Sequence, residues 1–435
     1  MKTLDQIAAE LQGYDPQALS AGQVLDFLSR LVAPVQDAVK LPLFEALGRV
    51  LAEDVVSPFD VPPHDNSAMD GFAFDGSQLA AGTALELRVA DGTALAGKAW
   101  QGSVQTGQCV KIMTGAIMPA GLDTVVPQEF VKQHPDGGIS IPPGLLRAGD
   151  NRRLRGEDLA QGLPALRKGE ILTPARLGLA ASLGLPTLPV WRPLRVAYFS
   201  TGDEILSLGE APREGAVYDS NRYTVFGMLR RLGCEVIDMG VVRDEPALLE
   251  AAFTEAAARA DAIITSGGVS VGEADFTKAM MKKLGDVAFW RIAMRPGRPM
   301  AVGRIPPADG QTTPINPQGA ILFGLPGNPV AVMVTFLAFV RPALLQMMGA
   351  GAAQPPLLKA RSLEPMRKKA GRTEYQRGWV SAAADGSLRV KTTGSQGSGV
   401  LRSMAEANGL IVLHHAQGNV AVGDEVDVLM FEGVI

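Results

Sequence analysis

The chain has very little of the two side chains that most often hold zinc. Among its 435 residues there are only two cysteines, Cys109 and Cys234, and four histidines. So few thiols argue against a disulfide framework and against a Cys/His zinc site. Scarce cysteine is typical of a reducing cytosol, so we predict a cytoplasmic protein. The charged N-terminal stretch has no apolar core and does not resemble a secretory signal.

An excess of positive charge is also missing. The 41 basic residues face 45 acidic residues, which gives a formal net charge of −4. This balance argues against a nucleic-acid partner, although it leaves room for a local basic pocket that binds a small anion. Neither a GxxxxGK[ST] loop nor a GxGxxG loop is present, so no single motif points to a nucleotide fold.

A membrane span is not expected either. Residues 310–340 carry no charge, but the GLPGNP sequence at 324–329 interrupts them. A spanning helix needs about 20 apolar residues without such a break. We therefore predict a buried strand, a tight turn and a helix here, and no membrane partner.

The spacing of the apolar residues and the frequency of glycine and proline change several times along the chain. Apolar residues spaced three and four apart predict helices within residues 22–52, interrupted by Pro34 and Pro42, and another helix near 174–183. Short alternating runs between glycine and proline clusters predict β structure over 55–155 and again from about 355, with a hairpin at Asp385-Gly386. Short strands are expected at the end of the chain, at 409–413, 419–423 and 424–431. The predicted domains are 1–54 with 156–192 (helical and linker region), 55–155 (β-rich), 193–348 (α/β) and 349–435 (C-terminal β).

Between these β regions, apolar strands alternate with helices. The expected strands are 194–200, 235–242, 262–267 and 321–325, and the expected helices are 221–232, 246–259, 274–284 and 329–346. Gly233 is expected to end the first helix, Pro246 to begin the second, and Asn328 with Pro329 to cap the last. This alternation predicts a mainly parallel sheet covered on both faces, within a multidomain α/β protein that also has β domains.

Ligands of open α/β sheets bind beyond the carboxyl ends of the strands, so the loops there are the candidate site. Glycines in these loops let backbone N–H groups approach an anion. Carboxylates beside them would repel an anion unless a hard cation such as Mg²⁺ lay between. The candidate metal ligands are Glu204, Asp244 and Asp275, and the candidate binding residues of the loops are Gly267, Gly268, Ser270, Gly272, Pro326, Gly327, Asn328 and Pro329.

Arg291, Arg295 and Arg298 offer planar forks for phosphate or another oxyanion. Most of the candidates also have a purely structural explanation. Asp244 and Asp275 could serve only as acids near helix N-termini, Glu204 as a solvated loop residue, and Asn328 as a cap. A second polar cluster, in residues 62–73, 113–116 and 153–158, could form either turns or a pocket wall.

Eight short motifs, in this order, resemble those of the molybdopterin molybdenumtransferases, the family of MoeA and the gephyrin E domain. They are DNSAMDGFA (65–73), IMTGA (112–116), GED (156–158), STGDE (200–204), YDSNR (218–222), SGGVSVGEAD (266–275), PGRP (296–299) and GLPGNPV (324–330). The resemblance runs from about residue 20 to the C-terminus. It implies a homodimer with a central domain like that of MogA and a small C-terminal β-barrel.

The resemblance also implies a reaction. Adenylylated molybdopterin and molybdate give molybdenum cofactor and AMP with the help of Mg²⁺, and an adenylyltransferase hands over the substrate. The site would lie between the α/β domain of one subunit and the N-terminal β region of the other. Carried over by motif, the catalytic residues are Asp70, Thr114, Asp158 and Asp275, and Arg372 and Ser398 bind substrate.

The chain departs from the family at a few places. The three arginines stand where lysine is common, His64 replaces an aromatic, and the 306–319 stretch is long. Two alternatives stay open, namely a pterin-binding scaffold without turnover and a molybdopterin adenylyltransferase.

Overall fold

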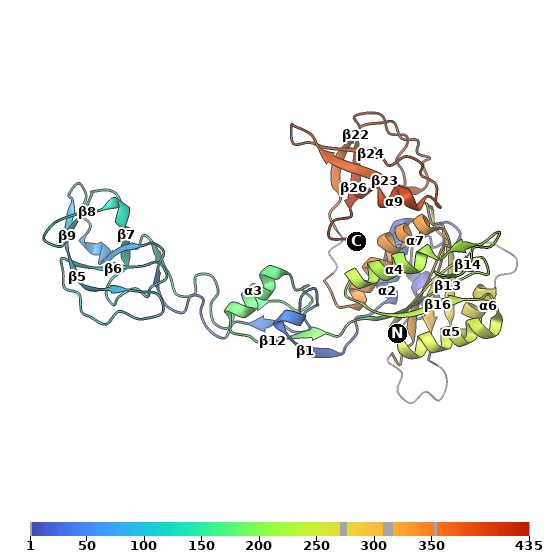
Figure 1. The fold of residues 1–435 in the computed structure, drawn as a ribbon, viewed down its shortest axis with the longest axis horizontal. Coiled ribbons are helices and arrows are strands. Elements are labelled where there is room, and N and C mark those ends of the chain that lie inside the picture. The colour runs from blue at the N-terminus through green and yellow to red at the C-terminus, as the bar shows by residue number, and fades with distance from the viewer. Residues whose placement is uncertain (1, 270–275, 308–315, 352–354, 435) are drawn as a thin grey trace. The chain divides into compact units, whose positions relative to one another are not determined.

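The central sheet is built from strands whose residues are nearly all apolar. The computed structural model describes residues 2–269, 276–307, 316–351 and 355–434. The six strands of the central sheet lie in the order β16-β13-β17-β21-β20-β18 (Figure 1). Their bounds are Glu235–Val242, Arg195–Thr201, Ala262–Ser266, Ala320–Leu325, Pro299–Ile305 and Asp286–Arg291. The first four strands are parallel, and β20 runs antiparallel to both of its neighbours, β21 and β18. The predicted α/β fold with a mainly parallel sheet is confirmed.

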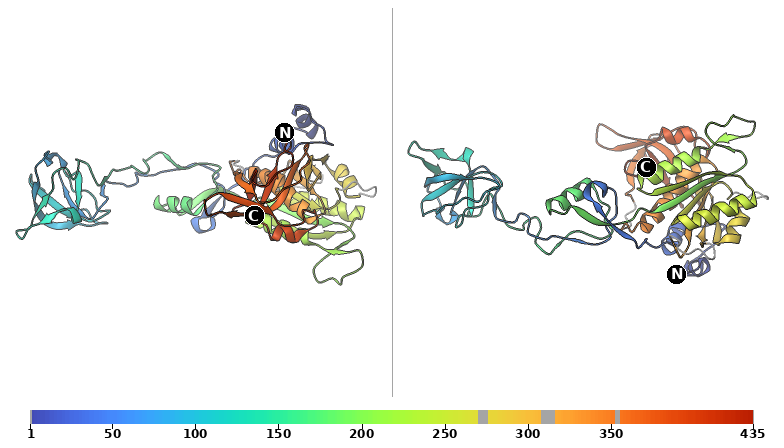
Figure 2. Two further views of the ribbon diagram at one scale, coloured as in Figure 1. Left: turned by 90° about the horizontal axis from the view of Figure 1, so that it is seen from above. Right: turned by 60° about the horizontal axis from the view of Figure 1, so that its bottom comes forward.

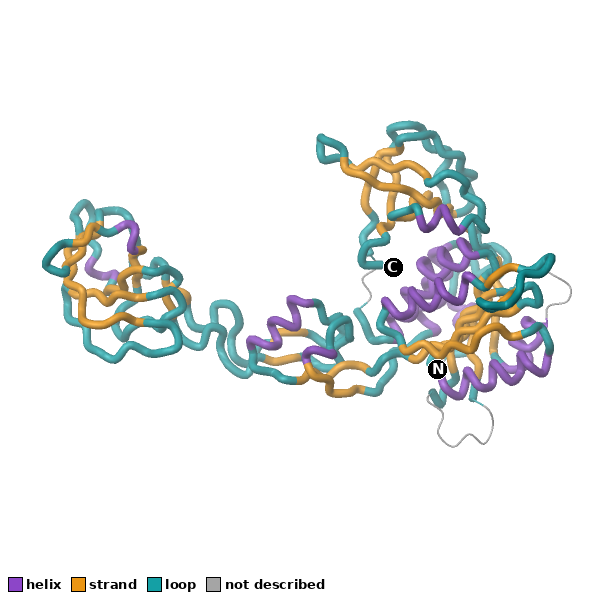
Figure 3. The backbone as a smooth tube through the Cα atoms, viewed as in Figure 1, coloured by secondary structure: helices purple, strands orange, loops and turns teal. Residues whose placement is uncertain are grey.

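Helices cover both faces of this sheet. Successive strand residues point to opposite faces, so Val196 and Tyr198 pack in one hydrophobic cluster and Ala197 and Phe199 in the other. The first cluster includes α2, α4 and the helix after β21, and the second includes α5 and α6 (Figure 3). The helices are α1 (Leu4–Glu10), α2 (Ala21–Leu31), α4 (Ser220–Arg231), α5 (Pro246–Arg259) and α6 (Phe276–Leu284).

The predicted helix ends are largely confirmed. The backbone of Gly233 has a φ of +79° just beyond α4, and Pro246 occupies the first turn of α5. The Asp219 side chain caps α4 by accepting a hydrogen bond from the backbone N–H of Arg222. Asn328 takes the N-cap position of α7, but its side chain makes no capping hydrogen bond. The Asn328 amide is therefore available to the loops around it.

One long apolar helix follows β21. It joins α7 (Pro329–Thr335), a π-helical turn (Phe336–Val340) and α8 (Arg341–Met347). Among the described residues it alone is long and apolar enough to cross a membrane, and most of it is buried inside the protein. The strand, turn and helix predicted over 321–346 are confirmed.

A closed five-stranded barrel follows in the C-terminal region. β22 (Leu358–Ser362), β23 (Thr373–Ala382), β24 (Leu388–Thr392), β26 (Glu425–Met430) and β25 (Gly409–Leu413) form one sheet, which closes because β25 pairs with β23. The short strand β19 (Met294–Arg295) of the α/β region pairs with the start of β23. The short helix α9 (Leu401–Ala405) contacts α7 (Figure 2). The predicted C-terminal barrel is confirmed.

Contacts divide the chain into two units, and the second is mostly β. It comprises residues 53–168 and 174–187. Its sheet has the order β7-β4-β6-β5-β9-β8, with the bounds Thr124–Pro127, Gly71–Phe74, Gln108–Ile112, Leu85–Ala94, Gly138–Ile141 and Lys132–Gln133. Shorter pairs are β3 (Asn66–Ser67) with β10 (Arg152–Arg153), and β2 (Val55–Val56) with β11 (Pro164–Leu166), and the helix is α3 (Pro174–Ser182). The division into four domains stays a prediction.

Two local predictions are wrong. The helix predicted between Pro42 and residue 52 does not form, because only a single 3-10 turn (Leu43–Glu45) exists before the backbone of Gly48 adopts a φ of +74°. Val50 and Leu51 then form bridges to Ile171 and Val190 instead. Ahead of them, β1 (Ala38–Pro42) pairs with β12 (Thr187–Trp191). The strand expected at 419–423 is reduced to one bridge at Val420.

The N-terminal helices join the α/β core through an aromatic contact. Phe27 of α2 is fully buried, and its ring meets that of Trp290 edge to face at 4.8 Å. We expect Phe27→Ala to lower the free energy of unfolding by about 3–5 kcal/mol, because it leaves a cavity. Phe226→Ala, on the exposed side of α4, should cost less than about 1 kcal/mol. Equal losses in denaturant titrations would contradict this assignment of the core.

Candidate functional site

A large cavity lies at the carboxyl edge of the central sheet. It has a volume of about 780 Å³. The loop after β13 contributes Thr201, Gly202 and Glu204, the loop after β16 Asp244, the loop after β17 residues 267–269, and the loop after β21 residues 326–328. Residues 294–299 and barrel residues 372 and 396–398 complete the wall. The sheet and the barrel therefore share one polar hollow.

Close backbone packing forms the floor of this cavity. Gly267 has a φ of +94°, and its N–H donates to Leu325 O at 3.1 Å. A Cβ on Gly267 would lie only 2.4 Å from the carbonyl oxygen of Thr201. The turn after β21 is fixed by Asn221, whose amide donates to Gly327 O at 2.7 Å. Residues without side chains thus let the three loops approach one another.

Two carboxylates face the cavity from different loops. Asp244 Oδ1 accepts a hydrogen bond from the buried Thr277 hydroxyl at 3.0 Å, which orients that carboxylate. Glu204 is exposed, and its carboxylate lies over Gly202. Thr201 is 4% exposed, and its hydroxyl has no hydrogen-bond partner among the described residues. Two carboxylates and one buried hydroxyl therefore lie at this end of the cavity.

Three arginines border the same cavity. Arg295 and Arg298 are exposed and form no ion pair within the described part of the chain. Arg372 is held in place by Glu374, which is 2% exposed, through contacts of 2.8 Å from Nε and 2.7 Å from Nη2. The guanidinium groups are the kind of donor that binds phosphate or another oxyanion in a fork.

A ring of hydroxyl groups lies at the ends of β13 and β17. The Tyr198 hydroxyl forms hydrogen bonds with Ser200 Oγ at 2.9 Å and with Ser266 Oγ at 2.7 Å. Burial, with a contribution from Asp219, raises the pKa of Tyr198, so the phenol stays neutral. Neutral hydroxyls at this position tie together the two strands that precede the cavity loops.

The chain matches known proteins over nearly all of its length. The MoeA N-terminal region (domains I and II) matches residues 19–184, a probable molybdopterin-binding domain 197–346, and the MoeA C-terminal region (domain IV) 359–431. The chain belongs to the molybdopterin molybdenumtransferase family. It is therefore a transferase with a role in molybdenum-cofactor biosynthesis.

Individual relatives agree with this assignment. The molybdopterin molybdenumtransferase of Haemophilus influenzae is 41% identical over 94% of this chain and 97% of its own. That of Nostoc is 36% identical over 91% and 89%. A crystal structure of the MoeA protein from Pyrococcus horikoshii superposes with a TM-score of 0.76 at 28% identity, over 95% of this chain and 100% of the other. The family resemblance expected from the motifs is confirmed.

Most of the binding residues and metal ligands predicted from the sequence line the cavity. They are Glu204, Asp244, Gly267, Gly268, Arg295, Arg298, Pro326, Gly327, Asn328, Arg372 and Ser398. Arg291 lies at the end of β18, where its backbone N–H donates to Pro16 O, and neither Arg291 nor Pro329 lines the cavity. Ser270, Gly272 and Asp275 lie outside the described residues. The roles of all these residues stay predictions.

The remaining family residues belong to the other unit. Asp70 Oδ1 accepts hydrogen bonds from Thr114 N at 2.7 Å and from Thr114 Oγ1 at 2.6 Å. These bonds hold the pKa of Asp70 below its usual value. The side chain of Asp158 is exposed, while its backbone N–H donates to Val61 O at 3.1 Å. The DNSAMDG and MTGA motifs thus meet in one polar pair.

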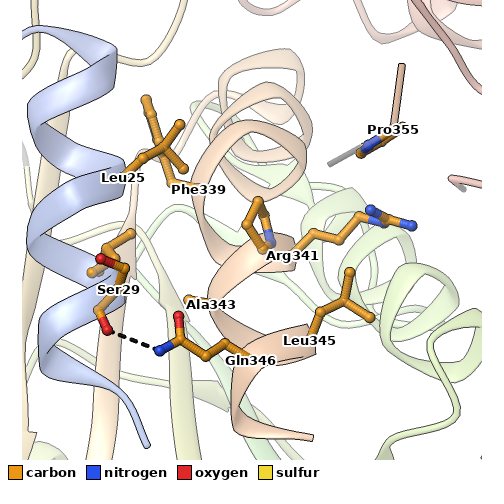
Figure 4. Close-up of a pocket in the computed structure, with 10 residues that line it drawn as sticks. Leu25, Ser29, Phe339, Arg341, Ala343, Leu345, Gln346 and Pro355 are labelled. Atoms are coloured by element: carbon orange, nitrogen blue, oxygen red, sulfur yellow. Dashed lines mark hydrogen bonds between the residues drawn. The ribbon is translucent and has the colours of Figure 1, made fainter. Parts of the chain in front are cut away.

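A second cavity has a different character. It lies between α2 and α8 and has a volume of about 110 Å³ (Figure 4). Leu25, Leu28 and Phe339 contribute to its apolar wall, and Gln346 donates to Ser29 O at 2.8 Å. Burial lowers the pKa of Arg341 at its rim. No carboxylate lines it, so it does not offer the ligand set of the larger cavity.

Two glycines with the same backbone angle test the tight floor of the larger cavity. Gly267 and Gly209 both have a φ of +94°, but a Cβ on Gly209 would meet no atom within 4 Å. Both alanine variants carry left-handed strain of roughly 1–2 kcal/mol. We expect Gly267→Ala to be less stable than Gly209→Ala by at least about 1 kcal/mol in chemical unfolding. Equal stabilities would show that the floor is not tightly packed.

The Asp70–Thr114 pair makes a measurable electrostatic prediction. In Thr114→Val the hydroxyl donor is lost and the backbone donor remains, so the pKa of Asp70 should rise toward its ordinary value. The carboxyl carbon signal in an NMR titration reports this pKa. Asp75, whose pKa is lowered by Ser77, is the internal control and should not change. An unchanged pKa of Asp70 would contradict the assigned pair.

Proposed function

We propose that this chain inserts molybdate into adenylylated molybdopterin and releases AMP, in a reaction assisted by Mg²⁺. The observation that carries the proposal is the single cavity in which Arg295, Arg298 and Arg372 face Glu204 and Asp244. Both substrates are polyanions, and the family to which the chain belongs uses molybdopterin and molybdate.

The arginines fit the anionic side of the reaction. Arg295 and Arg298 have no ion pair among the described residues, so their charge is free to meet an incoming oxyanion. Arg372 is already oriented by the buried Glu374 and does not have to be ordered on binding. Fixed cations beside a phosphoanhydride stabilise the charge that develops as the bond to AMP breaks.

The acidic side of the cavity fits a hard divalent cation. Glu204, Asp244 and the Thr201 hydroxyl offer oxygen atoms, the ligands that Mg²⁺ prefers. Among the described residues no group of three or more metal-binding side chains exists. Mg²⁺ commonly takes one or two carboxylates and completes its sphere with substrate phosphates and water. When bound, it would neutralise phosphate oxygens as a Lewis acid.

Other parts of the proposal rest on the family resemblance. We propose a cytoplasmic homodimer in which the Asp70, Thr114 and Asp158 cluster of one subunit serves the cavity of its partner. Asp275 would act there as a further metal ligand or base. The substrate would be delivered by a molybdopterin adenylyltransferase, since the chain is proposed to consume that enzyme's product.

An assay with purified protein tests the reaction. With adenylylated molybdopterin and Mg²⁺, we expect AMP release that depends on molybdate. Glu204→Gln and Asp244→Asn should each slow it by roughly a hundredfold, because a cation ligand is lost. Glu210→Gln, in the exposed loop nearby but outside the cavity wall, is the matched control and should stay within about twofold.

Other outcomes identify the alternatives. Net adenylylation of free molybdopterin from ATP would assign the chain to the adenylyltransferase step. Tight pterin binding without AMP release would make it a scaffold. Full activity in both carboxylate variants would contradict the proposed role of the acidic side.

A further inference from the structure

An irregular loop of the barrel forms part of the cavity wall. Residues 393–400 connect β24 to α9 without regular secondary structure, and Gln396, Gly397 and Ser398 line the cavity. Loops of this kind are held by side chains or by backbone contacts from elsewhere in the fold. Here most of the hydrogen bonds to residues 395–397 involve one residue, Arg377 of β23.

The Arg377 side chain donates to consecutive carbonyl groups of this loop. Its Nη2 is 3.1 Å from Ser395 O and 2.9 Å from Gly397 O, and its Nη1 is 3.4 Å from Gln396 O. The backbone of Arg377 adds a bond of 2.8 Å from its N–H to the Gln396 side chain. The next carbonyl, that of Ser398, accepts from the N–H of Val330 in α7 at 3.1 Å.

The planarity of the peptide bond fixes where the N–H groups of this loop point. In a trans peptide the C=O and the following N–H point in opposite directions. The carbonyls of residues 395–397 face Arg377, so the N–H groups of residues 396–398 face away from it. Among the described residues these three N–H groups have no hydrogen-bond acceptor. Successive N–H groups that point to the same side of a turn can form an anion-binding nest.

Arg377 also carries a charge that no carboxylate balances. It is fully buried, and it forms no ion pair with any described residue. Burial, with the nearby cation Arg295, lowers the pKa of Arg377 to about 10, so it stays protonated at neutral pH. Neighbouring Arg372 differs, because it forms an ion pair with Glu374. A buried, unbalanced cation exerts a stronger field than a solvated one.

We propose that Arg377 is a positioning residue, which turns the 395–397 carbonyls inward and so presents the 396–398 N–H groups to a tetrahedral oxyanion in the cavity. Its positive charge adds to the attraction from behind the loop. Arg377 itself does not line the cavity, so it would act on the oxyanion only through the loop. The inference rests on the proposed function and deepens it, because it names the groups that hold the oxyanion.

Calorimetric titration with molybdate, and separately with inorganic phosphate, tests this role. We expect Arg377→Met to weaken oxyanion binding by roughly tenfold or more, because both the charge and the loop geometry are lost. Arg377→Lys keeps the charge but cannot bond three carbonyls with a planar fork, so it should show an intermediate loss. The values of KM for molybdate should follow the dissociation constants.

The matched control is Lys368, a second buried cation of the same barrel. It is 6% exposed, and its Nζ donates to the carbonyls of Lys369 at 3.0 Å and Gln417 at 2.9 Å, away from the cavity loop. Lys368→Met should lower the melting temperature while oxyanion binding stays within about twofold of the wild type. A merely structural role for Arg377 would make the two methionine variants alike in binding.

Each outcome separates this inference from the proposed function. The inference would be overturned if the Arg377→Met variant folds and binds the oxyanion within twofold of the wild type. If Arg377→Met does not fold, wild-type oxyanion binding by Arg377→Lys would overturn it instead. Phosphate binding that depends on Arg377, without molybdate-dependent AMP release, would keep the nest and reject the proposed reaction. If the wild-type protein releases AMP but binds neither molybdate nor phosphate in the titration, the proposed reaction would stand and the anion-binding role of the 396–398 N–H groups would be rejected.

Discussion

Charge repulsion is the constraint on which the proposed site depends. A cavity that accepts a polyanion cannot also present Glu204 and Asp244 unless positive charge balances both. The chain supplies positive charge in the lining of the same cavity through Arg295, Arg298 and Arg372, and a divalent cation would supply it beside the acids. The division of the cavity into a cationic wall and an acidic wall follows from this balance.

The C-terminal barrel has a specific place in this arrangement. Strand β19 extends the sheet of the barrel, so Met294 and Arg295 are paired with Thr373 and Glu374. The same short ladder therefore holds arginines from two distant segments near one another. The contact between the loop 395–398 and the N-terminus of α7 adds a second connection through Val330. The barrel thus completes the anion-binding wall that the α/β sheet leaves open.

Much of the fold could be predicted because strand–helix alternation is a strong pattern. The strand ends also placed Glu204, Asp244 and Gly267 at one edge, since parallel strands share their carboxyl edge. The helix predicted between Pro42 and residue 52 is wrong because apolar spacing alone does not report the turn at Gly48. The strand register there is set by partners more than 100 residues away in sequence.

The supporting residues of the site were harder to predict. Arg377 and Glu374 have the sequence context of ordinary barrel strand residues, and only the fold brings them to the cavity. Thr201 lies within the STGDE motif, but its unpartnered hydroxyl is a property of packing that the sequence does not report. The sequence also places Glu374 only three residues before Arg377, and only the fold shows that Glu374 pairs with Arg372 instead. The Asp70–Thr114 pair came from family resemblance alone, since 44 residues separate its members.

The central claim is that one cavity between the sheet and the barrel binds the oxyanion that is transferred. Molybdenum has an anomalous X-ray signal, so an anomalous difference map from crystals soaked in molybdate measures its position directly. The account predicts a peak bordered by Arg295, Arg298, Arg372 and the backbone of residues 396–398. A map whose ordered molybdate lies only elsewhere on the protein would contradict it.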